Sequence, residues 1–255
     1  MHAPIRSVTA LVALALCAAC VPGQPPPADR EAAPASAVAQ AAPVPVVLLD
    51  PGHNGGNAAA TAEINRPVPD GRGGTKSCNT TGTASDAGYP EHAFNWDLAQ
   101  RVRTRLEAAG LRVVLTRPDD DGVGPCVDER GAAGGRAGAA AAVSLHADGA
   151  APAARGFHVA HADPAVHAGP ESSRLATALR DALRDGSFPP ADYIGQDGLD
   201  GRDDLAGLNL STVPTALVEA GNMRNAEEAR LLADPAGRER YAEAISAGVL
   251  AFLGR

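Results

Sequence analysis

The stretch "VVLLDPGHNGG", residues 46–56, joins a run of four apolar residues to an Asp-Pro-Gly-His turn and a pair of glycines. A short apolar run that ends at Pro-Gly is typical of a buried parallel strand. His53 therefore stands just past the carboxyl end of the predicted strand. In open α/β sheets, ligand sites form beyond the carboxyl ends of the strands. His53 is the first candidate site residue.

Strand and helix patterns alternate along the rest of the chain. Apolar residues recur every four positions over residues 91–109, and Gly110 stands where such a helix would end. Further helices are predicted over residues 128–138 and 172–183 and from Asp234 onward. Strand patterns occur in "LRVVLTR", "AAAVSLHAD", "GFHVAHA" and "VPTALVEAG". The alternation predicts a single α/β domain over residues 45–255, with a mostly parallel twisted sheet and helices on both faces.

The amino terminus carries the pattern of an export signal. Residues 8–19 form an apolar run that is too short to span a bilayer and has the length of a signal-peptide core. The exit sequence "LCAAC" resembles a lipoprotein cleavage box with Cys20 as the lipidated residue, although Cys17 stands where Leu is expected. Lipid anchoring to the cell membrane and plain removal of residues 1–20 both stay open, and either route takes the chain to the periplasm, cell wall or exterior.

Composition restricts the partners. Residues 21–44 are rich in Pro and Ala with almost no bulky apolar side chain, which predicts a flexible tether. The formal net charge of −8 argues against nucleic-acid binding, because contacts to phosphates need a basic patch. No membrane-spanning segment is expected in the mature chain.

Four residues converge on one edge of the predicted sheet. Like His53, His146 in "AVSLHAD" and Glu219 in "TALVEAG" follow apolar strand runs, and Glu91 begins the helix after the first long loop. Two imidazoles and a carboxylate with one open position are a usual ligand set for catalytic zinc. A carboxylate at a helix start also fits the helix dipole alone. Asp50, at the end of the first strand, is a candidate to orient a histidine ligand.

The motifs "LLDPGHNGG", "EHAFNWDLAQRVRTRLEAAGLRVVLTR", "SLHAD" and "VPTALVEAGNMRNAEEARLL" together resemble the zinc-dependent N-acetylmuramoyl-L-alanine amidases of amidase family 3, in their actinobacterial single-domain form. The resemblance covers residues 46–253. It implies that His53, Glu91 and His146 hold one zinc ion per chain and that Glu219 acts as general base on a water molecule. The substrate would be peptidoglycan or a muropeptide, cut at the amide between N-acetylmuramic acid and L-alanine, by a monomeric enzyme.

Two other functions stay open at this point. One is a zinc peptidase that cuts within the stem peptide, because spacing alone does not select the amide. The other is a non-catalytic, metal-bearing protein that binds or activates cell-wall material. His158 and His161 cannot both reach one metal, because an even and an odd position of one strand point to opposite faces, and we expect them on the surface or in the substrate groove. Arg202 and the two aspartates after it are predicted to form a solvated loop.

The cysteines Cys78 and Cys126 are left once the leader is removed, and they can pair in an oxidising compartment. The alternative is two free buried thiols. Both residues fall in loops on the edge that carries the candidate ligands. A disulfide would therefore hold the long loop of residues 54–90 beside the site, and it would stabilise the fold by about 4 kcal/mol.

Overall fold

The computed structural model describes Gly23 and residues 43–255. The expected signal peptide, Cys20 and most of the expected tether lie outside the described residues. Within the described part of the chain, no helix combines the length and the apolar character that a membrane crossing needs.

A six-stranded sheet forms the centre of the domain. Its strands are, in spatial order, β4 (Arg112–Leu115), β1 (Val46–Pro51), β5 (Ala141–Asp148), β8 (Thr215–Asn222), β6 (His158–Ala162) and β7 (Leu199–Arg202). The first four strands are parallel to one another, whereas β6 pairs with β8 in antiparallel fashion and β7 runs parallel to β6. The predicted α/β domain with a mostly parallel sheet is confirmed.

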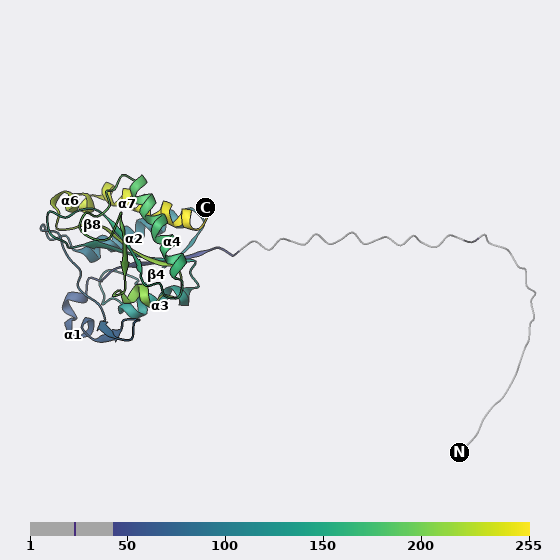
Figure 1. Ribbon diagram of the computed structural model, residues 1–255, viewed down its shortest axis with the longest axis horizontal. Helices are drawn as coiled ribbons and strands as arrows, with labels where there is room; N and C mark the ends of the chain where they lie inside the picture. The colour runs from purple at the N-terminus through teal and green to yellow at the C-terminus, as the bar shows by residue number, and fades with distance from the viewer. Residues whose placement is uncertain (1–22, 24–42) are drawn as a thin grey trace, which may run out of the picture. The chain divides into compact units, whose positions relative to one another are not determined.

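Helices cover both faces of this sheet (Figure 1). The larger layer consists of α2 (Glu91–Ala108), α4 (Gly169–Asp185), α6 (Ala226–Ala233) and α7 (Pro235–Phe252). The opposite face carries α3 (Val127–Ala137) and the short α5 (Ala206–Asn209). In α2, the four apolar residues that predicted the helix are all fully buried: Phe94, Leu98, Val102 and Leu106.

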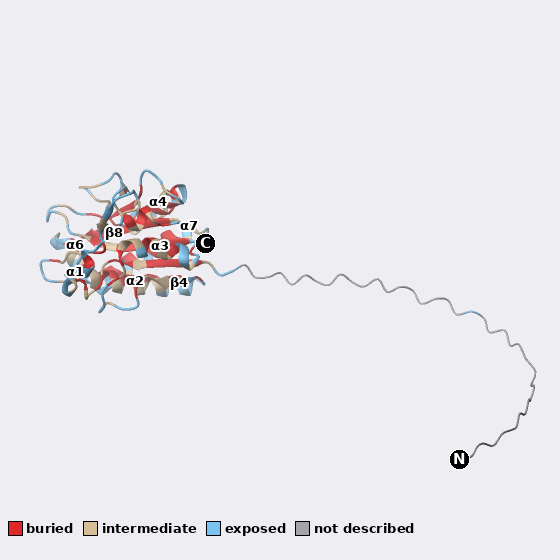
Figure 2. Cartoon of the chain, turned by 90° about the horizontal axis from the view of Figure 1, so that it is seen from below, coloured by how far each residue is buried: buried red, intermediate tan, exposed pale blue. Residues whose placement is uncertain are grey.

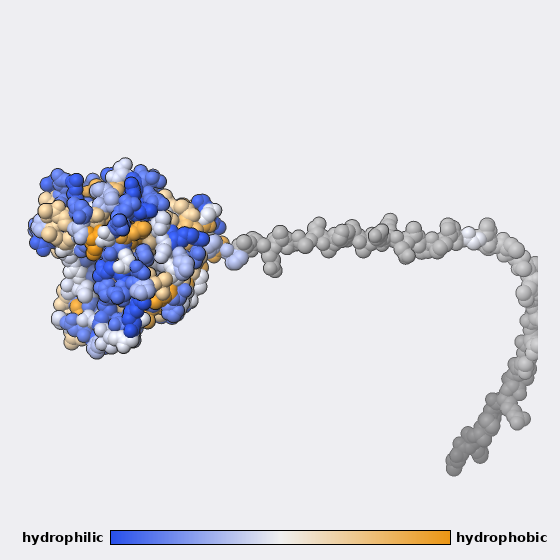
Figure 3. All heavy atoms as spheres, in the orientation of Figure 1, coloured by the Kyte–Doolittle hydropathy of each residue, from blue (hydrophilic) through white to orange (hydrophobic). Residues whose placement is uncertain are grey.

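The two faces of the sheet differ in chemistry. Alternate residues of β5, Val143, Leu145 and Ala147, belong to the main core beneath α2, α4 and α7. The residues between them face the α3 side, where the core cluster is small. Buried residues accordingly concentrate in the sheet and on the inner sides of the helices (Figure 2). The outer surface seen in Figure 3 is mostly hydrophilic.

The long loop between β1 and α2 contains structure that the sequence did not predict. It folds into a 3₁₀ turn η1 (Asn57–Ala59), a single helical turn α1 (Thr61–Ile64) and a hairpin of β2 (Pro67–Pro69) and β3 (Thr75–Ser77). Each hairpin strand has only three residues, too few to show an alternating pattern.

A disulfide bond between Cys78 and Cys126 ties this loop to the start of α3, as predicted. Both cysteines are buried and pack with Val68 in a small cluster of their own. The loop therefore has its own covalent and apolar anchor, separate from the main core.

Candidate metal centre

Glu91 is the first residue of α2, and the extended backbone of Pro90 before it lets the carboxylate turn inward. The residue is buried, with 4% of its surface exposed. One carboxylate oxygen, Oε2, accepts a hydrogen bond from the backbone N–H of Thr83 at 2.9 Å. The other, Oε1, accepts longer bonds from the side chain of Asn95 and the N–H of Ala147, both at 3.3 Å. The carboxylate is thus fixed at the floor of the site.

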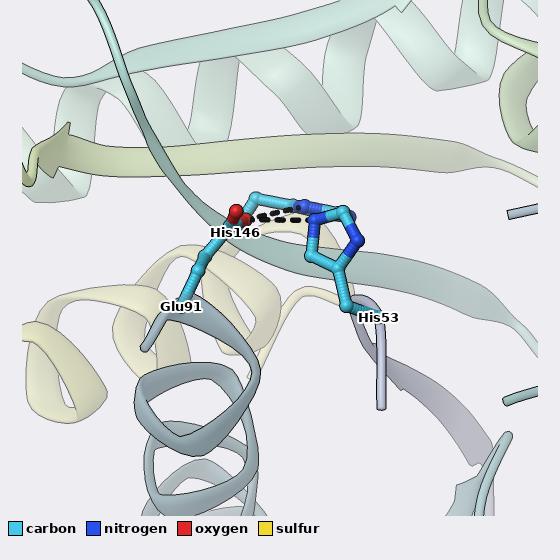
Figure 4. Close-up of side chains that lie close together, drawn as sticks. All are labelled: His53, Glu91 and His146. Atoms are coloured by element: carbon cyan, nitrogen blue, oxygen red, sulfur yellow. Dashed lines mark hydrogen bonds and ion pairs between the residues drawn. The ribbon is translucent and has the colours of Figure 1, made fainter. Parts of the chain in front are cut away.

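Two imidazole nitrogens meet the Oε1 atom of Glu91 (Figure 4). Nε2 of His53 lies 3.1 Å from it and Nδ1 of His146 lies 2.9 Å from it. One ligand atom from each of the three residues lies within 4.8 Å of the others. The structure therefore brings together three residues that the sequence placed in separate segments, at the end of β1, in β5 and at the start of α2.

Two glycines allow this close approach. A Cβ atom at Gly52 would overlap the ring of His146, and one at Gly82 would stand 2.8 Å from both Glu91 Oε2 and a ring carbon of His53. His53 itself has a left-handed backbone with φ of 59°, which residues other than Gly seldom adopt. Such strain is typical of residues that are held in place for function.

The hydrogen bond of the other ring nitrogen fixes the orientation of His53. Its Nδ1 lies 3.1 Å from the backbone oxygen and 3.2 Å from the hydroxyl of Thr80, and a hydrogen on Nδ1 would satisfy the backbone oxygen, which can only accept. The lone pair of a neutral ring is then on Nε2 and faces the carboxylate of Glu91. Two electron-rich atoms at this separation repel each other unless a proton or a metal cation lies between them. The three candidate ligand atoms lie within 4.8 Å of one another, which is compact enough for one cation to contact all three.

Glu219 lies in β8 directly beside His146, since the two residues pair in the register of β5 and β8. Its Oε2 atom is buried and has no hydrogen-bond partner among the described residues. Burial, followed by the negative charges of Glu91 and Asp148, raises the pKa of Glu219 well above its usual value. Burial also acts to raise the pKa of Glu91, but the adjacent rings of His53 and His146, as positive charges when protonated and as hydrogen-bond donors, outweigh it and lower that pKa. Neighbouring carboxyl groups with opposite shifts are typical of acid–base sites.

Among the described residues, the hydrogen bonds of Asp50 go to side chains other than histidine, so they give no direct support to the prediction that Asp50 orients a ligand ring. Its carboxylate accepts hydrogen bonds from Arg130 at 2.6 Å, Thr116 at 2.5 Å and Ser144 at 2.7 Å. Burial alone would raise the pKa of Asp50, but the charge of Arg130 and the two hydroxyl hydrogen bonds lower it to about 2. Arg130 in turn donates to the backbone oxygen of His53 at 2.9 Å. Asp50 thus supports the site through Arg130.

The disulfide joins the two segments that hold His53. Thr80, whose carbonyl accepts from the His53 ring, comes two residues after Cys78. Cys126 directly precedes α3, the helix that carries Arg130. The N–H of Val127 donates to the carbonyl of Cys78 at 2.7 Å and reinforces the junction.

The four candidate residues line a cavity of about 640 Å³ on the α3 side of the sheet. His158 and Arg202 line the same cavity. Arg202 ends β7 and forms ion pairs with Asp200 and Asp204, so the prediction of a solvated loop is wrong for this residue. Its signal in the sequence was weak, because "LDGR" is too short and too polar to show a strand pattern.

His158 and His161 project to opposite faces, as the strand pattern predicted. His158 lines the cavity, whereas Nδ1 of His161 lies 3.5 Å from the hydroxyl of Ser173 in α4. His92, which follows Glu91, points away from the cluster and pairs with Asp120 at 2.8 Å. None of these three histidines belongs to the ligand cluster.

Fold and site together define an α/β enzyme with a His-Glu-His cluster that could hold a metal ion, at one end of a mostly parallel sheet. The chain belongs to the N-acetylmuramoyl-L-alanine amidase family, whose pattern matches residues 47–251. Its class is therefore that of a peptidoglycan amidase, and its sequence is similar to amidases of mycobacteria.

Three relatives show the extent of the similarity. The chain is 50% identical over 211 residues to an N-acetylmuramoyl-L-alanine amidase of Mycobacterium tuberculosis, covering 82% of this chain and 86% of the relative. The crystal structure of the N-acetylmuramyl-L-alanine amidase of Mycobacterium smegmatis has 50% identity and a TM-score of 0.80, over 82% of this chain and 97% of that one. An amidase of Nostoc punctiforme has 26% identity and a TM-score of 0.63, over 83% and 98% of the two chains.

Proposed function

We propose that the chain hydrolyses the amide between the lactyl group of N-acetylmuramic acid and L-alanine of the stem peptide, with one zinc ion held by His53, Glu91 and His146 and with Glu219 as general base. The observation that carries this proposal is the meeting of two imidazole nitrogens on one carboxylate oxygen, at 2.9 and 3.1 Å, beside a second buried carboxyl group. Membership of the amidase family supports the choice of bond.

The donor set fits zinc better than a hard cation. Ca²⁺ and Mg²⁺ prefer shells made of oxygen atoms, whereas two imidazoles and one carboxylate suit zinc. When bound, zinc would polarise the scissile carbonyl and lower the pKa of a water molecule toward about 7. The hydrogen bond from Nδ1 of His53 to Thr80 supports the role of Nε2 as a ligand, because it leaves that lone pair free.

Glu219 is placed to move the proton in this reaction. As its carboxylate, it takes a proton from the attacking water, whose oxygen forms the new bond to the lactyl carbonyl carbon. When the carbon–nitrogen bond breaks, Glu219 returns the proton to the nitrogen of L-alanine. The products are a lactyl carboxylic acid and a free peptide amine. The raised pKa of Glu219 suits both halves of this transfer, because a weakly acidic carboxyl group is the stronger base.

The proposed substrate lies outside the cytoplasm, so the enzyme must be exported to reach it. We propose that residues 1–20 direct the chain out of the cell and that Cys20 is either lipidated or removed, with residues 21–44 as a tether. Mass spectrometry of the mature protein tests this: an acylated Cys20 at the amino terminus identifies an anchored form, and an unmodified later residue identifies a secreted form.

Incubation with a defined muropeptide tests the reaction itself. Release of a peptide with L-alanine at its amino terminus supports the amidase, whereas a cut between two stem-peptide residues would identify a peptidase. Binding of the muropeptide without any new amine terminus would identify a non-catalytic binder. Glu219→Ala in the same assay tests the base, and unchanged turnover would remove Glu219 from the mechanism.

A further inference from the structure

Glu219 stands between two imidazoles on neighbouring strands. It pairs with His146 of β5 on one side and with His158 of β6 on the other. Residues that pair directly across a sheet project from the same face. His146, Glu219 and His158 therefore form a row across three strands on the cavity side, and His158 is the member farthest from the metal cluster. Neighbouring strands lie about 4.8 Å apart, which places the backbones of the two histidines roughly 10 Å apart.

His158 is buried, with 3% of its surface exposed, yet its Nδ1 atom has no hydrogen-bond partner among the described residues. The edge of its ring packs against Tyr193 with centroids 6.1 Å apart, and the hydroxyl of Tyr193 donates to Asp148 at 2.8 Å. The ring is thus braced on one side while it lines the cavity on the other. Nδ1 has no accessible surface, so the ring nitrogen that can meet a polar ligand in the cavity is Nε2, which is neither fully buried nor hydrogen-bonded among the described residues.

The course of the reaction determines which part of the substrate comes near this ring. The scissile carbonyl must lie at the metal cluster, and the nitrogen of L-alanine must lie within reach of Glu219 to receive its proton. A stem peptide that continues in the same direction passes Glu219 and comes next to β6. Burial lowers the pKa of His158, which keeps the ring neutral near pH 7. A neutral imidazole has one donor and one acceptor nitrogen, as a peptide group has one donor and one acceptor.

We infer that His158 binds the leaving stem peptide through a hydrogen bond to the first peptide group beyond L-alanine. This inference rests on the proposed function. It makes His158 a specificity-determining residue: muropeptides with two or more amino acids should be better substrates than N-acetylmuramoyl-L-alanine, which has no peptide group at that place.

Two substrates and a matched pair of variants test this inference in the zinc-loaded, full-length mature protein. His158→Phe keeps a planar ring but loses both nitrogens. His161→Phe makes the same change on the same strand at the face turned to α4. We expect His158→Phe to lower kcat/KM about 10- to 100-fold on N-acetylmuramoyl-L-alanyl-D-isoglutamine and less than about threefold on N-acetylmuramoyl-L-alanine. His161→Phe should leave the ratio of the two substrates unchanged.

The ratio of kcat/KM for the two substrates distinguishes peptide binding by His158 from a purely structural role of this residue. An equal loss on both substrates, or no loss on either, would overturn the inference. If His158→Phe does not fold, His158→Gln and the wild type still decide the question: the wild type should prefer the longer substrate about tenfold, and an amide side chain at 158 should keep part of that preference. A wild type without any preference would contradict the role of His158. A wild type that cleaves neither substrate would instead contradict the proposed function.

Discussion

The two faces of the central sheet are formed by the same strands, but one face packs into a core and the other lines a cavity. On one face, Leu145 of β5 and Val218 of β8 lie in a large, closed core beneath three long helices. On the other face, the next residues along the same strands are His146 and Glu219, which line an open cavity beneath a thin cover of α3, α5 and the disulfide-bonded loop. Consecutive residues of one strand therefore belong to the core on one face and to the candidate site on the other.

This difference has a physical reason. A cavity lined by charged and polar groups is costly, because buried ionisable groups lose their hydration. The main core supplies the apolar burial that offsets this cost, so the strands can hold strained and poorly partnered residues at the site. Substitutions on the cavity face should therefore change activity more than stability, and substitutions on the core face should do the reverse.

The largest expected effect is on the cavity face. Glu219→Gln removes the proton carrier and should lower kcat by about 100- to 10,000-fold. Because Oε2 of the wild-type carboxyl group is buried without a hydrogen-bond partner among the described residues, the variant should melt at the same temperature or higher. Muropeptide turnover and a thermal melt measure the two quantities. A variant that melts at a much lower temperature, with unchanged turnover per folded molecule, would show that Glu219 serves stability and not catalysis.

The matched change on the core face is Leu145→Ala, one residue before His146. Leu145 is fully buried, so the variant should lose about 2–5 kcal/mol of unfolding free energy through lost burial and a residual cavity. Urea unfolding measures the loss, and zinc content and turnover well below the melting temperature should stay close to those of the wild type. Loss of zinc from the folded variant would show that the two faces are not independent.

The disulfide combines a stabilising and a positioning role on the cavity side, since it ties down the loop that covers the site and joins the segments that contact His53. Replacing both cysteines in Cys78→Ser/Cys126→Ser opens a link across 48 residues and should cost up to about 4 kcal/mol. Because Thr80 and Arg130 both contact His53 from segments next to this link, zinc affinity should fall as well. If the melting temperature falls but turnover and zinc affinity, measured below that temperature, stay unchanged, the disulfide only stabilises the fold and does not position His53.

The smallest expected effect concerns Asp50 and acid. The folded pKa of about 2 lies below the reference value of 3.8, so the carboxylate stabilises the fold above about pH 4, and this contribution is lost as the pH falls through 2. The contribution is about 2 kcal/mol. Asp50→Asn should reduce the loss of stability between these pH values by that amount, whereas Glu63→Gln, on an exposed position of α1, should not. Equal acid sensitivity in all three proteins would contradict the Arg130 pairing.

The sequence predicted the parts of the molecule that follow simple periodicity or motif order. The buried strands, helix α2 and the edge that carries His53, His146 and Glu219 are visible as apolar runs and their ends. Family motifs supplied the ligand set, and the export context supplied the pairing of Cys78 with Cys126.

Other features depend on contacts between distant segments, which periodicity does not show. Asp50 was predicted to orient a histidine because carboxylates near histidines often do so. In the structure, its carboxylate instead accepts a hydrogen bond from Arg130 of α3. Arg202 lies in a segment that reads as a loop and becomes an edge strand only through pairing with β6. The position of His158 beside Glu219 depends on the antiparallel register of β6, which the alternating pattern alone did not give.

Metal analysis of the purified mature protein tests the central claim most directly. We expect about one zinc ion per chain, and loss of both zinc and amidase activity in His53→Ala and in His146→Ala, with the fold retained. Acidification should release the zinc, because protons compete with it for the imidazole nitrogens. A protein that stays fully active after complete removal of metal by a chelator, or that binds zinc equally well without either histidine, would contradict the account.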